Sequence, residues 1–291
     1  MIPKATNHEF WKSIHAGANK AGRELGVEIL WKGPMREDDR DEQVKVVEDF
    51  VARRVDGIVL APTDNRALVP PAKEAARRGI PIVIIDSGIE WDEMVSFVAT
   101  DNYKGGVIAA DRLGQLLHDG GKVILLRYQV GSASTMNREA GFLDTMRAKY
   151  PNVEIASSNQ HGGATTESAY AVAERLLIQF DIDGVFCPNE STTFGMLRAL
   201  QDAGRAGKGR FVGFDSSAKL VEALANGELH GLVVQNPFRM GELGVQTLVA
   251  HLDGVAQPKR VDTGVMVATK ENMDQPDVKI LLQPDLAQWL E

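Results

Sequence analysis

The stretch "PIVIIDSG" at residues 81–88 decides the fold, because an apolar run ends abruptly in an aspartate. A short run rich in Val and Ile and bounded by turn formers is typical of a strand buried on both faces. Asp86 then lies where this strand leaves the core. The stretch "RFVGFDSS" at 210–217 repeats the pattern, with Asp215 in the same place. The repetition indicates two similar α/β halves.

Apolar runs recur along nearly the whole chain and alternate with amphipathic stretches of helical spacing, for example around 68–76 and 109–117. Strands that alternate with helices predict βαβ units and parallel sheets. The number of predicted strands is larger than one small sheet would hold. The predicted strands are 27–31, 57–62, 81–86, 97–101, 122–127, 184–188, 210–215 and 231–235.

Bulk composition narrows the class of protein. The 291 residues are enough for two ordinary domains. The net charge of −8 favours solubility and argues against a nucleic-acid groove as the main surface. Cys187 is the one cysteine, so neither an intrachain disulfide nor a multi-cysteine metal site can form. No stretch approaches the roughly 20 apolar residues of a membrane span. No signal peptide is recognisable, which leaves the compartment open.

Motifs of common enzyme classes do not occur in the sequence. It has no Walker-type phosphate loop and no GxSxG elbow. The glycines of 207–213 precede a predicted strand, whereas a dinucleotide fingerprint follows one. Residues 8–10 read "HEF", but Lys12 stands where a zincin has its second histidine. We therefore expect no catalytic residue, no metal site and no cofactor.

Asp86 and Asp215 are the first candidates for a site. Ligands of open parallel sheets bind beyond the carboxyl ends of the strands, so two facing halves would bring both aspartates to one cleft. Three roles stay open at this point. The pair could bind a ligand, could act as acid and base, or each could cap a following helix together with its serine neighbour.

The N-terminal stretch, residues 2–26, carries a second signal. A short strand from Ile2 enters a polar loop, and Phe10 and Trp11 then begin a helix. Two adjacent aromatic side chains at such a junction cannot both face the core, so we expect one in the core and one in the cleft. An aromatic ring offers an apolar surface to the C–H face of a sugar, while carboxylates and amides bind its hydroxyls.

Eight motifs in order make the chain resemble the sugar-binding periplasmic proteins of ABC transporters, in particular the ribose-binding-protein-like group. The resemblance covers essentially the whole chain, and although each motif is weak alone, the ordered set is specific. The motifs are "NHEFWKSIHAGANKAGRELG", "DGIVLAPTD", "IPIVIIDS", "VATDNYKGGVIAADRL", "MNREAGF", "GVFCPNESTTFGMLRAL", "FVGFDSS" and "LVVQNPFRMGELGV".

The resemblance implies the type I periplasmic binding protein fold, with two Rossmann-like lobes, parallel sheets and a three-crossing hinge. The crossings are expected near Thr100–Asn102, Gln235–Asn236 and Thr263–Val265. The N-terminal lobe would then comprise 1–101 plus 236–264, and the C-terminal lobe 102–235 plus 265–291. A ligand would bind between the lobes and be buried when the hinge closes.

The resemblance also implies a ligand-binding set. Asp86 would accept hydrogen bonds from sugar hydroxyls and Arg138 would donate them, while one of the paired aromatics stacks on the ring. Asn189, Asp215 and Gln235 would supply the polar contacts of the C-terminal lobe. The full predicted set is Lys4, His8, Phe10, Trp11, Asp86, Ser87, Arg138, Asn189, Asp215 and Gln235.

Several positions depart from the ribose-binding pattern. Ser87 stands where that group often has an arginine, and Ala61 replaces a polar asparagine. Lys4 and His8 stand where small polar residues are usual. Ribose is therefore not assumed. Lys4 either contacts the ligand or pairs with Asp86, since an unpaired ammonium in a cleft is costly.

The function implied is capture of a monosaccharide or similar polyhydroxylated small molecule and its delivery to an ABC transporter permease. The protein would be a periplasmic or otherwise extracytoplasmic monomer that does no chemistry on its ligand and binds no nucleic acid. One alternative is a sugar or autoinducer-type receptor for signalling or chemotaxis. A carbohydrate-active enzyme that uses Asp86 and Asp215 is the less favoured alternative.

Overall fold

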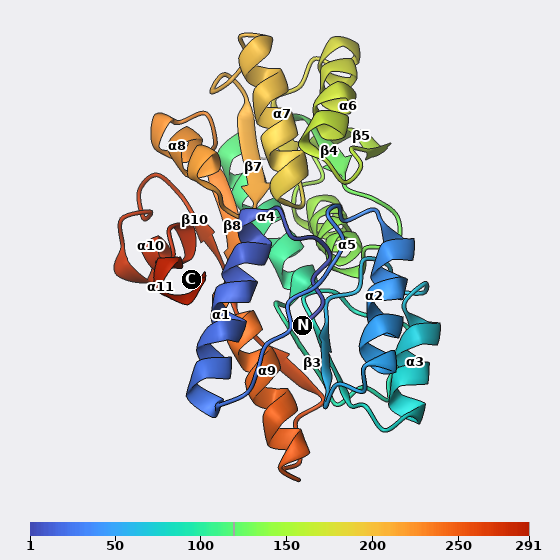
Figure 1. The fold of residues 1–291 in the computed structure, drawn as a ribbon. Coiled ribbons are helices and arrows are strands. Elements are labelled where there is room, and N and C mark those ends of the chain that lie inside the picture. Colours follow the sequence, from blue (N-terminus) through green and yellow to red (C-terminus); the bar gives the residue numbers. More distant parts are fainter. Residues whose placement is uncertain (119, 291) are drawn as a thin grey trace.

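The computed structural model describes residues 1–118 and 120–290, which form two α/β units, one above the other in Figure 1. The first unit holds a parallel four-stranded sheet in the order β1-β2-β3-β9. Ile2 adds a single parallel bridge to Leu60 at the β1 edge. The strands are β1 (Ile58–Leu60), β2 (Ile82–Ile85), β3 (Ser96–Ala99) and β9 (Arg260–Asp262).

The second unit holds a six-stranded sheet in the order β10-β8-β7-β6-β4-β5. Its pairs are parallel except for β10 with β8, which is antiparallel. The strands are β4 (Gly121–Arg127), β5 (Val153–His161), β6 (Gly184–Phe186), β7 (Arg210–Phe214), β8 (Gly231–Gln235) and β10 (Val265–Ala268). Parallel sheets in an α/β arrangement confirm the predicted fold class.

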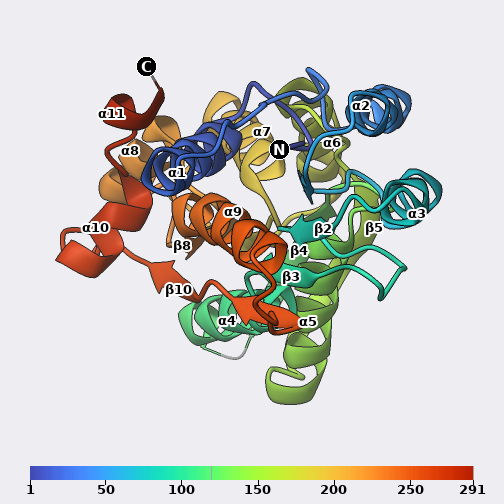
Figure 2. The ribbon, with the colours of Figure 1, turned by 60° about the horizontal axis from the view of Figure 1, so that its bottom comes forward.

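Helices pack on both sheets. Those of the first unit are α1 (Glu9–Leu25), α2 (Arg40–Ala52), α3 (Val69–Arg77) and α9 (Pro237–Leu252). The second unit has α4 (Asn102–Leu117), α5 (Ala133–Lys149), α6 (Thr166–Gln179), α7 (Glu190–Asp202), α8 (Ala218–Asn226) and α10 (Pro276–Leu282). A short final helix, α11 (Ala287–Leu290), packs on α1, as Figures 1 and 2 show.

The chain passes between the two units three times, after β3, after β8 and after β9. Two of these passages lie side by side. The hydroxyls of Thr100 and Thr263 are 3.3 Å apart, and the Thr100 hydroxyl donates to the Gly264 carbonyl at 3.1 Å. Both threonine side chains are buried. The polar groups of these linking segments are therefore paired with one another.

Seven of the eight predicted strand runs form strands, and the run at 27–31 does not. This prediction is wrong because the neighbouring segment, which begins at Met1, cannot continue a ladder of backbone hydrogen bonds with this run. The Met1 ammonium donates to the Leu30 carbonyl and the Lys32 N–H donates to the Met1 carbonyl, but Pro3 has no N–H to continue the pairing. The expected first strand is likewise reduced to the bridge at Ile2. The sequence pattern also misses β5, whose second half is largely exposed and polar.

Glycines allow two helix pairs to pack at close range. A β-carbon on Gly106 of α4 would lie 2.0 Å from the Arg138 carbonyl oxygen of α5, and one on Gly141 would lie 2.1 Å from the Tyr103 carbonyl oxygen. The α1–α9 pair has the same arrangement at Gly17 and Gly241. Figure 2 shows α1 beside α9 and α4 beside α5. The position of Arg138 therefore depends on the absence of a side chain at residue 106.

Gly106→Ala should lower the free energy of unfolding by about 1–3 kcal/mol, because α4 and α5 must separate to admit the methyl group. Thermal or urea unfolding measures this change. Gly88→Ala is the matched control, since a β-carbon there meets its nearest atom at 3.8 Å. Equal stability of the two variants would show that the close α4–α5 packing is not required.

Candidate functional site

A polar cleft lies between the two units, where the carboxyl ends of both sheets meet. It is lined by nine of the ten predicted ligand-binding residues, namely Lys4, His8, Phe10, Trp11, Asp86, Arg138, Asn189, Asp215 and Gln235. Their roles toward a ligand stay a prediction. Six further residues line the same cleft, namely Glu37, Tyr128, Ser132, Ser134, Thr135 and Glu190.

Asp86 and Asp215 leave their strands in the same unusual backbone conformation. Their φ angles are 61° and 68°, in the left-handed region that aspartate enters more readily than most residues. Each backbone N–H still donates to the adjacent strand, from Asp86 to the Val98 carbonyl and from Asp215 to the Val233 carbonyl. The turn redirects the chain at the sheet edge. The repetition seen in the sequence is therefore a repetition of backbone geometry.

Neither aspartate caps the helix that comes after it. No helix of the described chain begins after Asp86 before residue 102, and the N-cap of α8 is Ser217. Asp215 instead accepts a hydrogen bond at 3.1 Å from the backbone N–H of Glu190, at the start of α7. The capping alternative is therefore wrong for the following helices, and Asp215 supports a neighbouring helix.

Lys4 pairs with Asp86. Its ammonium lies 2.8 Å from Asp86 Oδ2, and both side chains are about as buried as core residues, at 4% exposure each. The ammonium also donates to the Ser134 hydroxyl at 3.2 Å, in the other unit. This pairing settles one part of the question about Lys4: the ammonium does neutralise Asp86, and it lines the cleft as well.

Arg138 organises the opposite wall of the cleft. The guanidinium is fully buried, stacks 3.9 Å above the Phe214 ring, and donates to the Asn102 side chain at 2.7 Å. It lies 3.8 Å from Asp215 Oδ2, and Gln235 donates to Asp215 Oδ1 at 2.6 Å. Burial raises the pKa of Asp215, and the nearby Arg138 charge opposes that rise.

The sequence predicts that one of the two adjacent aromatics lies in the core and the other in the cleft, and the structure agrees only in part. Trp11 is 1% exposed and belongs to the core of the first unit, yet it also lines the cleft. Phe10 is partly exposed and meets Trp11 edge to face, with centroids 5.0 Å apart. The indole N–H donates to Glu37 at 2.6 Å, and the hydroxyl of Tyr128 donates to the same carboxylate. Glu37 therefore joins the two units.

His8 and Glu190 face each other across the cleft, with Nδ1 and Oε2 3.9 Å apart. Asn189 caps α7, because its side chain accepts from the backbone N–H and the hydroxyl of Thr192. Burial, together with the nearby Asp215 charge, raises the pKa of Glu190 to about 8. The same helix start thus carries both a predicted ligand contact and a carboxyl group that favours its protonated form.

Ser87 does not line the cleft, contrary to its place in the predicted set. It is fully buried, and its hydroxyl accepts from the Ser134 backbone N–H at 3.1 Å. Glu190 and Tyr128 were missed although they lie shortly after strands β6 and β4, so the rule about strand ends could have found them. Glu37 lies in a loop that no strand pattern marks.

Backbone and side-chain contacts close the cleft on one side. The Asn65 N–H donates to the Gly131 carbonyl at 2.9 Å, and Arg40 donates to the Val130 carbonyl at 2.9 Å. Each pair joins the first unit to the loop after β4. These contacts, with those of Lys4 and Glu37, hold the two units together over the cleft.

A metal site or a membrane-spanning helix would indicate a different class of protein. Residues 1–118 and 120–290 contain no cluster of three or more His, Cys, Asp or Glu side chains placed to hold a metal ion. Across the same ranges, every helix is too short or too polar to cross a bilayer.

Residues 1–256 match the family model described as "Periplasmic binding protein domain". A D-ribose/D-allose-binding protein of Pseudomonas aeruginosa is 29% identical over 285 residues, which are 95% of this chain and 88% of that protein.

Two solved structures have a similar fold over nearly the full chain. A carbohydrate transporter solute-binding protein of Agrobacterium radiobacter, in complex with D-arabinose, has a TM-score of 0.94 and 34% identity, covering 97% of each chain. An ABC transporter solute-binding protein of Agrobacterium vitis, with bound D-fucose, has a TM-score of 0.92 and 38% identity. That match covers 97% of this chain and 98% of the other.

Burial also raises the pKa of Glu139, on α5, to about 7. The contribution of Glu190 and Glu139 to thermal stability should fall as the pH rises from about 5 to about 8. A carboxyl whose pKa is higher in the folded state stabilises that state below its unfolded pKa, and the benefit is lost as the pH passes the folded value. The pKa values of Glu190 and Glu139, about 8 and about 7, place the loss in this window. Melting temperatures across the range measure the slope.

Glu190→Gln should flatten this slope, because the amide cannot ionise. Glu74→Gln is the control, since the hydrogen bond from Arg78 and the charge of Arg77 lower the pKa of Glu74 below its ordinary value. An identical slope in native protein and Glu190→Gln would contradict the assignment.

Proposed function

This chain belongs to the periplasmic binding protein family, and we propose that it captures a monosaccharide, or a similar polyhydroxylated small molecule, in the cleft between its two units. Its fold is the type I periplasmic binding protein fold. The related proteins described above bind ribose or allose, D-arabinose and D-fucose, as their names state. A neutral sugar is therefore the ligand class that we propose here.

The observation that carries this proposal is the buried polar set from both units around aromatic side chains. Asp86 and Asp215 accept, Arg138 donates, and Phe10 with Trp11 offers an apolar surface. Two buried polar atoms, Gln235 Oε1 and Glu190 Oε2, have no hydrogen-bond partner among the described residues. Each such orphan costs about 1–3 kcal/mol, so a hydroxylated ligand that pairs with them stabilises the closed form.

We also propose that the cleft does no chemistry on the ligand. Asp86 is held by the Lys4 ammonium, and Asp215 accepts from Gln235 and from the Glu190 backbone. Both carboxylates are thus engaged as fixed acceptors. An acid–base pair would instead need one of them to hold and release a proton near the reacting bond.

The biological setting is proposed as delivery to an ABC transporter permease by an extracytoplasmic monomer, without nucleic acid as a partner. A receptor that passes sugar binding to a signalling partner is the alternative. The units are proposed to be 1–101 plus 236–264 and 102–235 plus 265–291. The packing of α11 on α1 departs from this division, because the end of the chain returns to the first unit.

A neutral sugar should raise the melting temperature. A ligand at a hundredfold excess over its Kd stabilises the folded state by about 2.7 kcal/mol. The screen should compare D-ribose, D-allose, D-arabinose, D-fucose and D-tagatose, with glucose 6-phosphate as a charged control. After long incubation the bound sugar should be recovered unchanged. Turnover would overthrow the binding role, and no shift with any neutral sugar or polyol would argue against the ligand class.

Asp86→Asn should weaken sugar binding at least tenfold, because a hydrogen bond to a charged group contributes about 1.5–3 kcal/mol. The single change also leaves the Lys4 ammonium buried without its counter-ion, so stability should fall. The double variant Lys4→Met with Asp86→Asn should regain stability but not affinity. Isothermal titration and thermal unfolding separate the two effects. Native affinity in the double variant would remove Asp86 from the site.

A further inference from the structure

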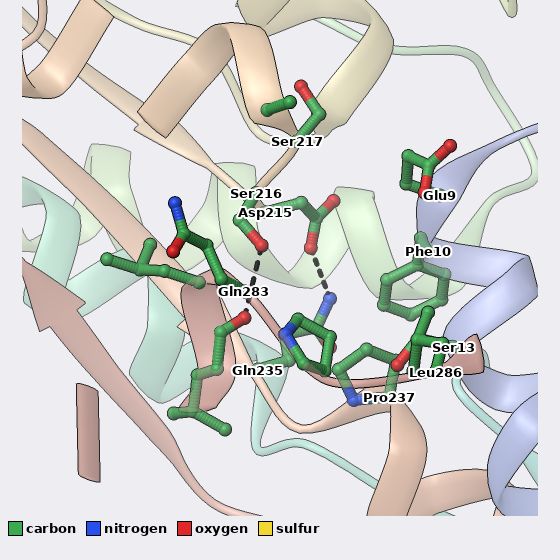
Figure 3. A pocket seen from close by; sticks show the side chains of 14 residues that line it. Glu9, Phe10, Ser13, Asp215, Ser216, Ser217, Gln235, Pro237, Gln283 and Leu286 are labelled. Carbon is green, nitrogen blue, oxygen red and sulfur yellow. Dashed lines mark hydrogen bonds between the residues drawn. The ribbon is translucent and has the colours of Figure 1, made fainter. Parts of the chain in front are cut away.

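A second chamber adjoins the cleft, and Figure 3 shows it from close by. We call it the annex; its volume is about 210 Å³. This is far more than the roughly 10–15 Å³ that one water molecule needs. The annex and the cleft share Phe10, Asp215 and Gln235. A ligand that reaches these three residues from the cleft therefore lies at the entrance of the annex.

Unpartnered polar atoms mark the annex as more than a packing gap. The Ser13 hydroxyl and Gln235 Oε1 are both buried and have no hydrogen-bond partner within residues 1–118 and 120–290, and both side chains line the annex. Ser13 is 2% exposed and lies on α1, one turn after Glu9. Buried polar groups in folded proteins nearly always have partners. These two atoms therefore indicate a polar occupant.

The lining defines which occupant fits. In the described part of the chain no lysine, arginine or histidine lines the annex, while the carboxylates of Glu9 and Asp215 do. An anionic group would thus meet negative charge without a cation to pair with. Leu282 and Leu286 add apolar surface. Hydroxyl groups both donate and accept, so a neutral hydroxylated ring suits this mixture of oxygen atoms and apolar carbon.

The C-terminal segment forms one wall of the annex. Residues 281–284 and 286 line it, and the Ser216 hydroxyl donates to the Leu281 carbonyl at 3.2 Å. The segment then reaches the first unit, where Asn19 donates to the Trp289 carbonyl at 2.8 Å. The annex is therefore bounded by both units and by the end of the chain, at one side of the ligand cleft.

We propose that the annex binds a second, neutral sugar unit linked to the monosaccharide in the cleft, so that a disaccharide or comparable glycoside is a ligand of this protein. The inference rests on the proposed function, because the first sugar unit must occupy the cleft. It adds Ser13, Ser217 and Gln283 as residues that determine which glycosides are accepted.

Isothermal titration tests the proposal. The probes are the best-binding monosaccharide of the screen and disaccharides in which a neutral pyranose is linked to each of its hydroxyls in turn. Ser217→Phe fills the annex from the start of α8, and Lys219→Phe on the same helix is the control, since Lys219 does not line the annex. Ser13→Ala is a second variant that removes only a hydroxyl.

At least one disaccharide should bind the native protein as tightly as the monosaccharide or more tightly. Ser217→Phe should weaken that disaccharide by about tenfold or more, and Ser13→Ala should weaken it less, with the monosaccharide changed by under about twofold. Lys219→Phe should change neither. Binding of the monosaccharide without any disaccharide overturns the annex proposal alone. Equal weakening of both ligands by Ser217→Phe also overturns it. Absence of all sugar binding instead contradicts the proposed function.

Discussion

The need to neutralise two buried carboxylates shapes the whole cleft. Asp86 and Asp215 each stand at the end of a buried strand, at 3% and 7% exposure. An isolated charge there would be very costly, so a cation lies beside each, and Asp215 also accepts hydrogen bonds from Gln235 and from the Glu190 backbone. Lys4 comes from the first segment of the chain and Arg138 from α5. These two contacts require both the start of the chain and helix α5, which packs closely on α4, to lie next to the cleft.

The left-handed backbone at both aspartates links this electrostatic arrangement to the fold. In a strand that continued straight, the next side chain would point to one face of the sheet, whereas the turn brings the carboxylate into the cleft at the sheet edge. The conformation carries a modest cost of about 1–3 kcal/mol, which surrounding structure must offset. Here the adjacent strand accepts each aspartate N–H, so the turn is made without leaving that donor unpaired.

The sequence predicts much of this arrangement because buried parallel strands are continuous apolar runs, and the residues just beyond their carboxyl ends lie at one edge of the sheet. That rule places Asp86 and Asp215 in one cleft, while Asn189 and Gln235 are predicted from the family resemblance. It fails where position depends on partners that the pattern does not contain. The run at 27–31 is apolar but lies beside a segment that contains Pro3. Exposed β5 and the loop with Glu37 give no apolar signal.

Some buried polar atoms of the closed cleft lack partners among the described residues, and this affects the free energy of opening the cleft. Gln235 Oε1, Glu190 Oε2 and the Ser13 hydroxyl find no hydrogen-bond partner in the part of the chain that the structure describes, in which the two units are joined. Opening would expose these atoms to water, and a hydroxylated ligand would satisfy them in the closed form. Closure without a ligand is therefore penalised at the atoms that a ligand would meet. The C-terminal segment has the opposite effect. It contacts β8 through α10 and α1 through α11, and these contacts favour the closed form. The balance between these two terms sets how much of the ligand's binding energy is spent in closing the cleft.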